Sequence, residues 1–354
     1  MKFQQQTHLP KNPLPIVIIG AGGIVKDAHL PAYKMAGFSV LGVFDVDVAK
    51  AESLQNQFTS IKKVYRSLDV LLEDAQKNNT VFDIAVPAKH LLKILEQIPD
   101  GSPVLMQKPM GENLEEAQRI LELCREKNLV SAVNFQLRYA PYILAAKDII
   151  EKGLLGDVYD MEIKVCVYTP WHLWDFLNQS PRVEILYHSI HYLDMIRSFW
   201  GNPKKIYAST IKHPKMKKLA ATRSSMILDY DDYKQARILT NHGHEFGLKH
   251  QESYLKIEGT KGAIKIRIGL SLDYPKGMPP KMEYVLLDDN KGWREIPLIG
   301  GWFPHAFIGT MAVLQNHYQN NSIPLPHSTE DAFETMKLVE LAYRSSNEGG
   351  IKFE

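Results

Sequence analysis

The sequence has little cysteine, and this scarcity excludes two classes of protein. Only two cysteines occur among the 354 residues, Cys124 and Cys166, and neither belongs to a Cys-x-x-Cys pattern. A disulfide framework and a cysteine-rich metal site are therefore both excluded. Isolated cysteines of this kind are typical of reduced thiols, so we expect a cytoplasmic protein.

The chain also lacks a charge excess and a long apolar run. Lys and Arg total 42 against 40 Asp and Glu, which leaves a net charge of only +2. This balance gives no basic surface for nucleic acid or anionic lipid. No apolar run reaches the ~18 residues that a membrane span needs, and residues 1–15 lack the apolar region of a signal peptide. We expect no nucleic-acid partner and no membrane partner.

What the sequence does contain is enough apolar material for two folded domains. Hydrophobic residues make up 45% and charged residues 23%, close to the average of globular proteins. At roughly 100–200 residues per domain, the length predicts about two domains. A change of pattern after Asn134 indicates the boundary, giving domains at 1–135 and 136–354.

The first region alternates short apolar runs with amphipathic stretches. The runs are bounded by Gly, Pro or Asp and are partly β-branched, as expected for strands buried on both faces. This repetition predicts an α/β, Rossmann-type doubly wound parallel sheet. The expected strands are 16–19, 39–44, 81–86, 104–106 and 130–133, and the expected helices include 48–58 and 114–127.

The second region alternates polar and apolar residues and carries hairpin-like punctuation. This pattern predicts an α+β domain with a large, mostly antiparallel open sheet. The expected strand regions are 156–167 and 206–268, with turns at 229–232 and 259–262, and the expected helices are 139–152, 186–200, 306–318 and 329–343.

A glycine turn follows the first expected strand directly and precedes a helix. Gly20, Gly22, Gly23 and Ile24 supply the close backbone approach and the helix N-terminus that bind a pyrophosphate. Asp45 ends the second strand, where an acid accepts from both ribose hydroxyls and repels a 2′-phosphate. We therefore expect NAD rather than NADP. The alternative is a glycine turn without a ligand, and the bulky Val25 at the third glycine position weakens the pattern.

Two further segments carry groups suited to proton transfer. Lys108 follows the strand at 104–106, at the edge where open α/β sheets bind ligands; the alternative is a surface lysine before a proline turn. His191 lies on an expected helix with Glu184, Tyr187 and His188, and histidine suits general-base work on an alcohol. Alternatives are a buried core histidine or a metal site built from Glu184, His188 and His191. We expect no metal.

Aromatic and histidine side chains around this helix allow two interpretations. The segment 168–176 is dense in aromatics, and Trp171 is expected either to stack on a sugar ring or to pack in the core. Trp302 and His305 pose the same choice. The pair His242 and His244 has metal-like spacing, but we interpret it as structural because it falls in an expected hairpin without a third ligand.

Together these motifs resemble the glucose–fructose oxidoreductase/inositol dehydrogenase (Gfo/Idh/MocA) family over nearly the whole chain. The motifs that carry the resemblance are Gly20 to Ile24, Ala28 to Pro31, Phe44-Asp45, Ala85 to Pro87, Gln107 to Pro109, Phe135 to Arg138, His191 to Asp194, Pro324 to Ala332 and Ala342 to Ser345.

The resemblance implies a two-domain NAD(P)-dependent oxidoreductase that acts on sugars or cyclitols. It implies that Lys108 contacts both substrate and nicotinamide ribose, that His191 is the acid/base, and that Pro87 and Arg138 belong to the binding sites. It also implies a homodimer or homotetramer formed through the open sheet. Two family acids are replaced, by Gln107 and Tyr187.

We therefore expect an NAD-dependent dehydrogenase or reductase for a sugar, sugar derivative or cyclitol. His191 and Lys108 are the expected catalytic residues, and the expected substrate-binding residues are Tyr187, Glu184, His188, Trp171 and Arg138. The two replaced acids motivate an alternative, a non-catalytic NAD(P)-binding sensor or co-repressor on the same fold. An enzyme that keeps its NAD bound through a closed redox cycle is a third hypothesis.

Overall fold

The computed structural model describes residues 1–351, which divide into two compact units. We call them the six-stranded unit and the eight-stranded unit, after the sheet that each contains. The six-stranded unit comprises Gln6–Tyr139 and Phe303–Met336. The eight-stranded unit comprises Met1–Gln5, Ala140–Trp302 and residues from Lys337 onward.

The six-stranded unit is built on a parallel sheet whose strand order is β3-β2-β1-β4-β5-β6. The direction of strand succession reverses between β1 and β4, and ligands bind at such switch points, beyond the carboxyl ends of the strands. All four residues of β1, β4 and β5 are buried, as in a sheet covered on both faces. The strands are β1 (Ile16–Ile19), β2 (Val40–Phe44), β3 (Val64–Tyr65), β4 (Val81–Ile84), β5 (Pro103–Met106) and β6 (Val130–Val133).

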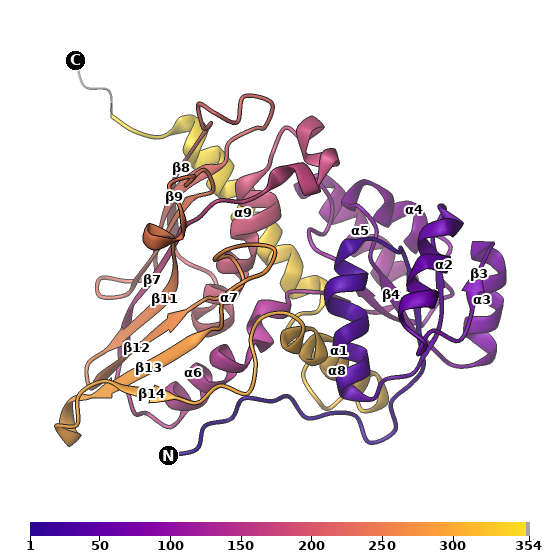
Figure 1. Cartoon of the computed structure of the whole chain (residues 1–354), viewed down its shortest axis with the longest axis horizontal. Coiled ribbons are helices and arrows are strands. Elements are labelled where there is room, and N and C mark those ends of the chain that lie inside the picture. Colours follow the sequence, from indigo (N-terminus) through magenta and orange to yellow (C-terminus); the bar gives the residue numbers. More distant parts are fainter. Residues whose placement is uncertain (352–354) are drawn as a thin grey trace. The chain divides into compact units, whose positions relative to one another are not determined.

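Helices connect these strands and cover the sheet (Figure 1). The helix α5 shows why the sequence folds this way: the Asn113 side chain accepts the Glu116 N–H at 2.9 Å and thus caps the first turn. At the other end of a helix, Gly37 closes α1 with φ +71°, a conformation that favours glycine. The helical segments are η1 (Val25–His29), α1 (Leu30–Ala36), α2 (Val48–Gln57), α3 (Leu68–Lys77), η2 (Ala88–His90), α4 (Leu91–Leu95), α5 (Leu114–Glu126) and η3 (Gln136–Tyr139).

A late segment of the chain completes this unit. The helix α8 (His305–Gln319) packs on α1, β5 and β6, and its Phe307 and Met311 belong to the core around β1. The helix α9 (Thr329–Glu348) begins in this unit, and its later residues belong to the other. By chain order the sequence analysis grouped residues 303–336 with the second domain; by packing they lie in the six-stranded unit. The assignment of a cofactor role and a substrate role to separate domains stays a prediction.

The eight-stranded unit holds a mixed sheet of order β14-β13-β12-β11-β7-β10-β9-β8. Every neighbouring pair is antiparallel except β7 and β10, which run parallel with Cys166 opposite Asn241. The strands are β7 (Val158–Cys166), β8 (Lys205–Ile211), β9 (Arg223–Asp229), β10 (Gln235–Asn241), β11 (Glu252–Gly259), β12 (Gly262–Arg267), β13 (Lys281–Leu286) and β14 (Arg294–Ile296).

One face of this sheet is buried and the other is open. In β9 and β10 every second residue is buried, while Ile227 and Leu239 between them are exposed. Such alternation is typical of a sheet that packs on a core on one side only. The helical segments of this unit are α6 (Pro141–Glu151), η4 (Trp171–Leu173), η5 (Asp175–Gln179), η6 (Glu184–Ser189), α7 (Ile190–Trp200), η7 (Leu248–His250), η8 (Leu287–Asp289) and the later part of α9.

The predicted fold class is confirmed: a parallel Rossmann-type sheet and a second, mostly antiparallel sheet. The expected strands of the first region and the turns at 229–232 and 259–262 are present. The sequence analysis missed β3, α3, β13 and β14. Both cysteines are free thiols, and among the described residues no helix is long and apolar enough to cross a membrane.

Candidate active site

The glycine turn lies between β1 and η1, as expected for a phosphate-binding loop. Gly20 has φ +110°, and a Cβ there would clash with the Ala85 carbonyl, so only glycine fits. A Cβ on Gly22 would meet nothing within 4 Å, which leaves the backbone accessible at that point. The Gly22 carbonyl accepts the N–H groups of Val25 and Lys26 and thereby starts the helical segment that Ile24 precedes.

Asp45 supports this turn directly. Its Oδ2 accepts the Ala21 N–H at 2.7 Å, and its Oδ1 accepts the Asp47 N–H at 2.8 Å. The carboxylate therefore ties the end of β2 to the loop after β1. The bulky Val25 is fully buried in the core around β1, so the unit accommodates it without opening the turn.

Lys108 follows β5, as the sequence analysis expected. Burial lowers the pKa of its ammonium group from 10.5 to about 8. Its backbone N–H donates to Gln107 Oε1 at 3.0 Å. Pro87 follows β4, which neighbours β5 in the sheet, and precedes the short segment η2. The expected cofactor-binding residues thus follow β1, β2, β4 and β5, four strands of one parallel sheet.

Gln107 belongs to a buried hydrogen-bonded group that we call the His29 cluster, defined as His29, Tyr33, Asp83, Gln107 and Asn134. His29 Nδ1 and the Tyr33 hydroxyl each lie 2.7 Å from Asp83 Oδ2. His29 Nε2 lies 3.2 Å from Gln107 Nε2 and 3.4 Å from Asn134 Nδ2. All five side chains are at least nine-tenths buried.

The amide orientations in the His29 cluster settle its protonation. Gln107 Oε1 accepts the Lys108 N–H and Asn134 Oδ1 accepts the Thr310 hydroxyl, so both amide nitrogens face His29 as donors. His29 Nε2 must therefore accept, and Nδ1 carries the proton that it donates to Asp83. Gln107, which stands where the family has an acid, thus donates to His29 Nε2.

Arg138 is fully engaged within the same unit. Its guanidinium donates to the Pro326 carbonyl and, at 2.5 Å, to Asp331 at the start of α9. These contacts account for its burial, and a role in substrate binding stays a prediction. The contacts also explain why residues 303–336 belong with the first sheet.

His191 lies in the first turn of α7 in the eight-stranded unit. Its ring stands edge-on to Trp302, with centroids 5.1 Å apart, and Trp302 also contacts Tyr192. Tyr187 lies one helical segment earlier and packs on Phe176. Burial, with the negative charge of Glu184, raises the pKa of Tyr192 well above its usual value.

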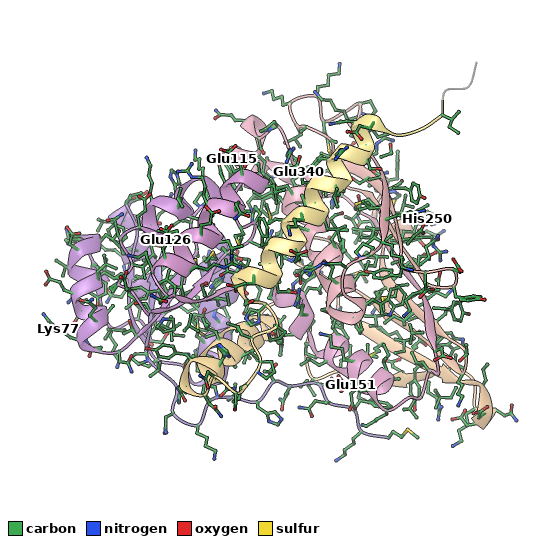
Figure 2. The ribbon with its side chains drawn as sticks, turned by 180° about the vertical axis from the view of Figure 1, so that it is seen from behind. Lys77, Glu115, Glu126, Glu151, His250 and Glu340 are labelled. Carbon is green, nitrogen blue, oxygen red and sulfur yellow. The ribbon has the colours of Figure 1, made fainter. Side chains whose placement is uncertain are left out.

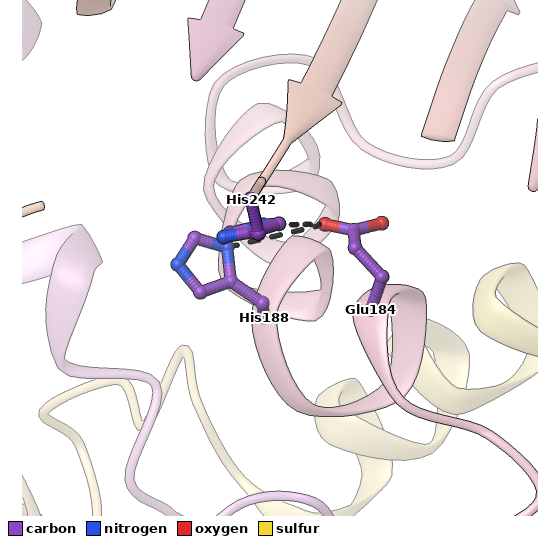
Figure 3. A group of neighbouring side chains, drawn as sticks. All are labelled: Glu184, His188 and His242. Carbon is purple, nitrogen blue, oxygen red and sulfur yellow. Dashed lines mark hydrogen bonds and ion pairs between the residues drawn. The ribbon is translucent and has the colours of Figure 1, made fainter. Parts of the chain in front are cut away.

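Glu184 and His188 lie on η6, a π-helical segment that continues into α7. Glu184 is fully buried, and its Oε1 accepts the Ser189 hydroxyl at 2.6 Å and lies 3.3 Å from His242 Nε2. His188 Nδ1 lies 4.0 Å from the same oxygen. Figure 3 shows both imidazoles beside this carboxylate, His242 entering from the end of a strand.

The direction in which the pKa of the Glu184 carboxyl is shifted follows from these contacts. Burial alone would raise the pKa of its carboxyl, but the hydrogen bond and the charge of His242, with the Ser189 hydroxyl, lower it below the usual value. His242 is itself held by Thr169, whose Oγ1 lies 2.7 Å from Nδ1. We call Thr169, Glu184, His188, Ser189 and His242 the Glu184 cluster.

Two expectations about this region need correction. His242 does not lie in a hairpin, because β7 pairs between β10 and β11. Among the described residues, the group of ligand-type side chains around Glu184 consists of Glu184, His188 and His242 and does not include His191. Residues 184–189 form a π-helix, whose angular spacing differs from that of an α-helix. The metal-like spacing of His242 and His244 was the one signal available, and His244 instead contacts Cys166 at 3.7 Å.

Trp171 completes the surroundings of the Glu184 cluster. Its ring lies 5.2 Å from that of His242, and it is buried with Leu177, Val183 and Leu219. Its indole N–H has no hydrogen-bond partner among the residues that the structure describes. The expected site residues thus form two groups: Lys108, Arg138 and the glycine loop in one unit, and Trp171, Glu184, Tyr187, His188 and His191 in the other.

Comparison with known proteins identifies the family. The family model "Oxidoreductase family, NAD-binding Rossmann fold" matches residues 14–135, and the "GFO/IDH/MocA C-terminal domain" model matches residues 143–265. The chain is 23% identical to D-apiose dehydrogenase of Rhizobium rhizogenes, over 94% of this chain and 95% of that protein. It is 27% identical to inositol 2-dehydrogenase/D-chiro-inositol 3-dehydrogenase of Lacticaseibacillus casei, over 49% and 50% respectively.

A solved structure agrees in fold. An oxidoreductase from Agrobacterium radiobacter, in complex with NAD+, L-tartaric acid and magnesium, superimposes with a TM-score of 0.76 at 21% identity, covering 96% of this chain and 98% of that one. The two family models together span most of the chain. The protein therefore belongs to the Gfo/Idh/MocA family and is an NAD(P)-dependent dehydrogenase or reductase.

Proposed function

We propose that the protein transfers a hydride between NAD and a hydroxyl-bearing carbon of a sugar, sugar derivative or cyclitol. In the oxidative direction the C–H hydride goes to the nicotinamide, the hydroxyl proton goes to His191, and a carbonyl remains. The observation that carries this proposal is Lys108, which follows a sheet strand in the same unit as the glycine turn and has a pKa lowered to about 8.

A lysine with this pKa is suited to hydrogen bonding with a substrate oxygen. Near neutral pH it is largely protonated and donates to a hydroxyl or carbonyl oxygen, yet it loses a proton far more readily than an exposed lysine. The names of the relatives support the substrate class, because D-apiose and inositol are both polyhydroxylated. Tyr187, Trp171 and Arg138 are proposed to contribute to substrate binding.

The cofactor preference follows from Asp45. Its carboxylate is held beside the glycine turn by the Ala21 N–H. A carboxylate at this position accepts from ribose hydroxyls and repels a 2′-phosphate, so we propose NAD rather than NADP. Calorimetric titration of the free enzyme with NAD and with NADP measures this preference directly.

The second candidate, a sensor or co-repressor without turnover, is motivated by Gln107 and Tyr187 in place of the family's acids. The His29 cluster weakens this motive, since Gln107 has a defined structural partner in His29. A screen of sugars, sugar acids and cyclitols, followed by NADH absorbance, distinguishes the two. Turnover of any member supports the enzyme, and tight NAD binding without turnover across the panel favours the sensor.

The variant His191→Ala tests the assignment of the acid/base. Loss of a general acid/base lowers the rate by typically ~10²–10⁴-fold, and we expect this fall in kcat with NAD affinity retained. His244→Ala is the matched control, because His244 lies outside the proposed site and contacts Cys166. Turnover in His191→Ala equal to that of the control would refute the assignment.

We also propose a homo-oligomer, a dimer or tetramer, formed through the open face of the eight-stranded sheet. Tyr207, Ile227 and Leu239 are exposed large hydrophobic residues on neighbouring strands of this face. A partner of the same kind would cover them. Sedimentation analysis of the wild type and of Leu239→Glu tests this. A cytoplasmic location stays a prediction.

A further inference from the structure

Three ligand-type atoms converge inside the eight-stranded unit. Glu184 Oε1, His188 Nδ1 and His242 Nε2 all lie within 4.8 Å of one another, and Figure 3 shows them grouped around one small volume. Glu184 and His188 come from η6, whereas His242 follows β10. Two elements distant in sequence thus contribute to one cluster.

We propose that Glu184, His188 and His242 bind one divalent transition-metal ion of the zinc type. Two imidazoles and one carboxylate are the ligand set that such ions prefer, whereas Mg²⁺ and Ca²⁺ prefer oxygen ligands alone. With Zn–N distances of ~2.0–2.1 Å, tetrahedral ligands lie roughly 3.3 Å apart. The Glu184–His242 separation is 3.3 Å, and the Glu184–His188 separation is 4.0 Å.

The charge of the cluster also suits a cation. Glu184 is fully buried, and its Oε1 lies 3.3 Å from His242 Nε2 and 4.0 Å from His188 Nδ1. Its Oε2 makes no hydrogen bond to any residue in the described part of the chain. A buried carboxylate is stable only when opposite charge or hydrogen bonds compensate it. The Ser189 hydroxyl and His242 contact Oε1, and a metal ion would add positive charge beside the same carboxylate.

A second layer of contacts orients two of the three ligands. Thr169 Oγ1 lies 2.7 Å from His242 Nδ1. Metal binding requires the tautomer in which Nδ1–H donates to this hydroxyl and the unprotonated Nε2 faces Glu184. The Ser189 hydroxyl fixes Glu184 Oε1 at 2.6 Å. Metal-binding histidines almost always donate their other N–H to such a partner, which sets the tautomer and the ring orientation.

A metal-free arrangement is the competing interpretation. In it His242 Nε2 carries a proton and pairs with Glu184 as an ordinary ion pair, and Thr169 donates to Nδ1. This interpretation explains the 3.3 Å contact, and in it the His188 ring packs against that of His242 with centroids 4.2 Å apart. The two arrangements differ in whether the protein takes up metal.

Three protein ligands leave one position open, as in catalytic zinc sites. His188 is the partly exposed ligand, with 21% of its side chain accessible, so the open position lies toward its side of the cluster. His191 follows three residues later, and Tyr192 contacts both His188 and Trp302. Resting on the proposed function, we assign this position to an oxygen of the polyol substrate.

Metal uptake by the full-length, tag-free protein tests the site without reference to turnover. After treatment with a chelator, the protein is titrated with Zn²⁺ in competition with a chromophoric chelator, and with Co²⁺ as a visible-absorption probe. We expect one equivalent per chain and a tetrahedral or five-coordinate Co²⁺ spectrum. His242→Gln should weaken Zn²⁺ binding by more than the ~10–100-fold that outer-layer changes cost.

Matched variants make the outcome decisive. His244→Gln removes the neighbouring histidine of the same motif and should bind Zn²⁺ like the wild type. His188→Gln changes a partly exposed side chain and replaces His242→Gln if that variant fails to fold. The proposal is overturned if the wild type takes up no stoichiometric Zn²⁺, or if His188→Gln and His244→Gln bind it equally.

The proposed metal site and the proposed oxidoreductase function can be refuted independently of each other. Turnover by a chelated, metal-free enzyme at the wild-type rate would remove the substrate role of the metal and leave the oxidoreductase assignment intact. Stoichiometric Zn²⁺ binding without turnover on any polyol would leave the metal site and remove the proposed substrate class.

Discussion

The protein contains two buried carboxylate–histidine clusters that share the same local helix structure but differ in the side chains around the histidine. In each, a π-helical segment leads into an α-helix, η1 into α1 and η6 into α7, and a histidine of that segment contacts or approaches a fully buried carboxylate. In the His29 cluster the far nitrogen of the histidine faces two amide donors. In the Glu184 cluster a second histidine approaches the same carboxylate oxygen.

This difference shows how one local structure serves two purposes. A π-helical turn places a side chain where regular α-helical spacing would not, and such turns are frequent at functional sites. The neutral amides around His29 occupy its Nε2 and leave that nitrogen unavailable to another ligand. Two imidazoles around Glu184 concentrate donor atoms that a cation can share. The surrounding donors, and not the helix, distinguish the His29 cluster from the proposed metal-binding cluster.

The largest expected effect is the loss of stability on removing His29. His29→Leu removes one of the two side chains that contact Asp83 Oδ2 and leaves the Tyr33 hydroxyl, and removing one partner of a buried pair costs about 3–5 kcal/mol. His188→Leu, in the more accessible cluster, should cost less than about 1 kcal/mol. Urea unfolding followed by far-UV circular dichroism measures both losses of stability. Tryptophan fluorescence would follow one unit alone, because all five tryptophans lie between residues 171 and 302, in the eight-stranded unit, whereas His29 lies in the six-stranded unit. Equal losses in the two variants would contradict the comparison.

A smaller, pH-dependent loss of stability is expected for Gln107→Glu. The new carboxylate faces His29 Nε2 in place of an amide donor, so two acceptors meet unless a proton lies between them. That proton is available at low pH and lost at high pH, so the stability of the variant falls as pH rises. We expect a loss of about 1–3 kcal/mol at pH 8 and less at pH 6.

Gln107→Met is the control for this prediction. It removes the amide donor without adding a titrating group, so its cost should be the same at both pH values. A Gln107→Glu variant whose urea midpoint shifts equally at pH 6 and pH 8 would show that His29 does not take up the proton.

The last effect concerns Lys108, whose folded pKa of about 8 lies below the unfolded value of ~10.4. The unfolded chain binds more protons between these values, so stability rises with pH across that window. Competitive acetylation as a function of pH should show half-maximal reactivity of Lys108 near pH 8. Lys77, which Figure 2 shows projecting outward from α3, serves as the exposed reference. A Lys108 profile that coincides with that of Lys77 would contradict the effect of burial.

Much of the fold could be predicted because its signals are local. The apolar runs at β1, β4 and β5 are bounded by turn residues, and the amphipathic stretch 114–127 corresponds to α5. The strand β3 has only two residues and carries too little pattern to recognise. The placement of residues 303–336 depends on packing of Phe307 and Met311 against distant strands, which no local pattern contains.

The candidate site divides in the same way. The glycine turn and Lys108 are defined by sequence neighbours, and the structure places them where the strands end. His242 could not be joined to Glu184, because their proximity depends on β10 pairing in parallel with β7. The π-helix at 184–189 could not be predicted from the sequence either. A pattern of apolar and polar residues over six positions does not distinguish a π-helix from an α-helix.

The parallel pairing of β7 with β10 also sets an order of events during folding. The strand β7 is synthesised well before β10, and between them come α7 and the hairpin partners β8 and β9. Contacts between segments so distant in sequence form late, because the closure of a long loop precedes any gain from pairing. Thr169 follows one of these strands and His242 the other, so their hydrogen bond exists only in the correct register. Uptake of a cation by Glu184, His188 and His242 would then report, on a refolding timescale, the moment at which the eight-stranded sheet closes.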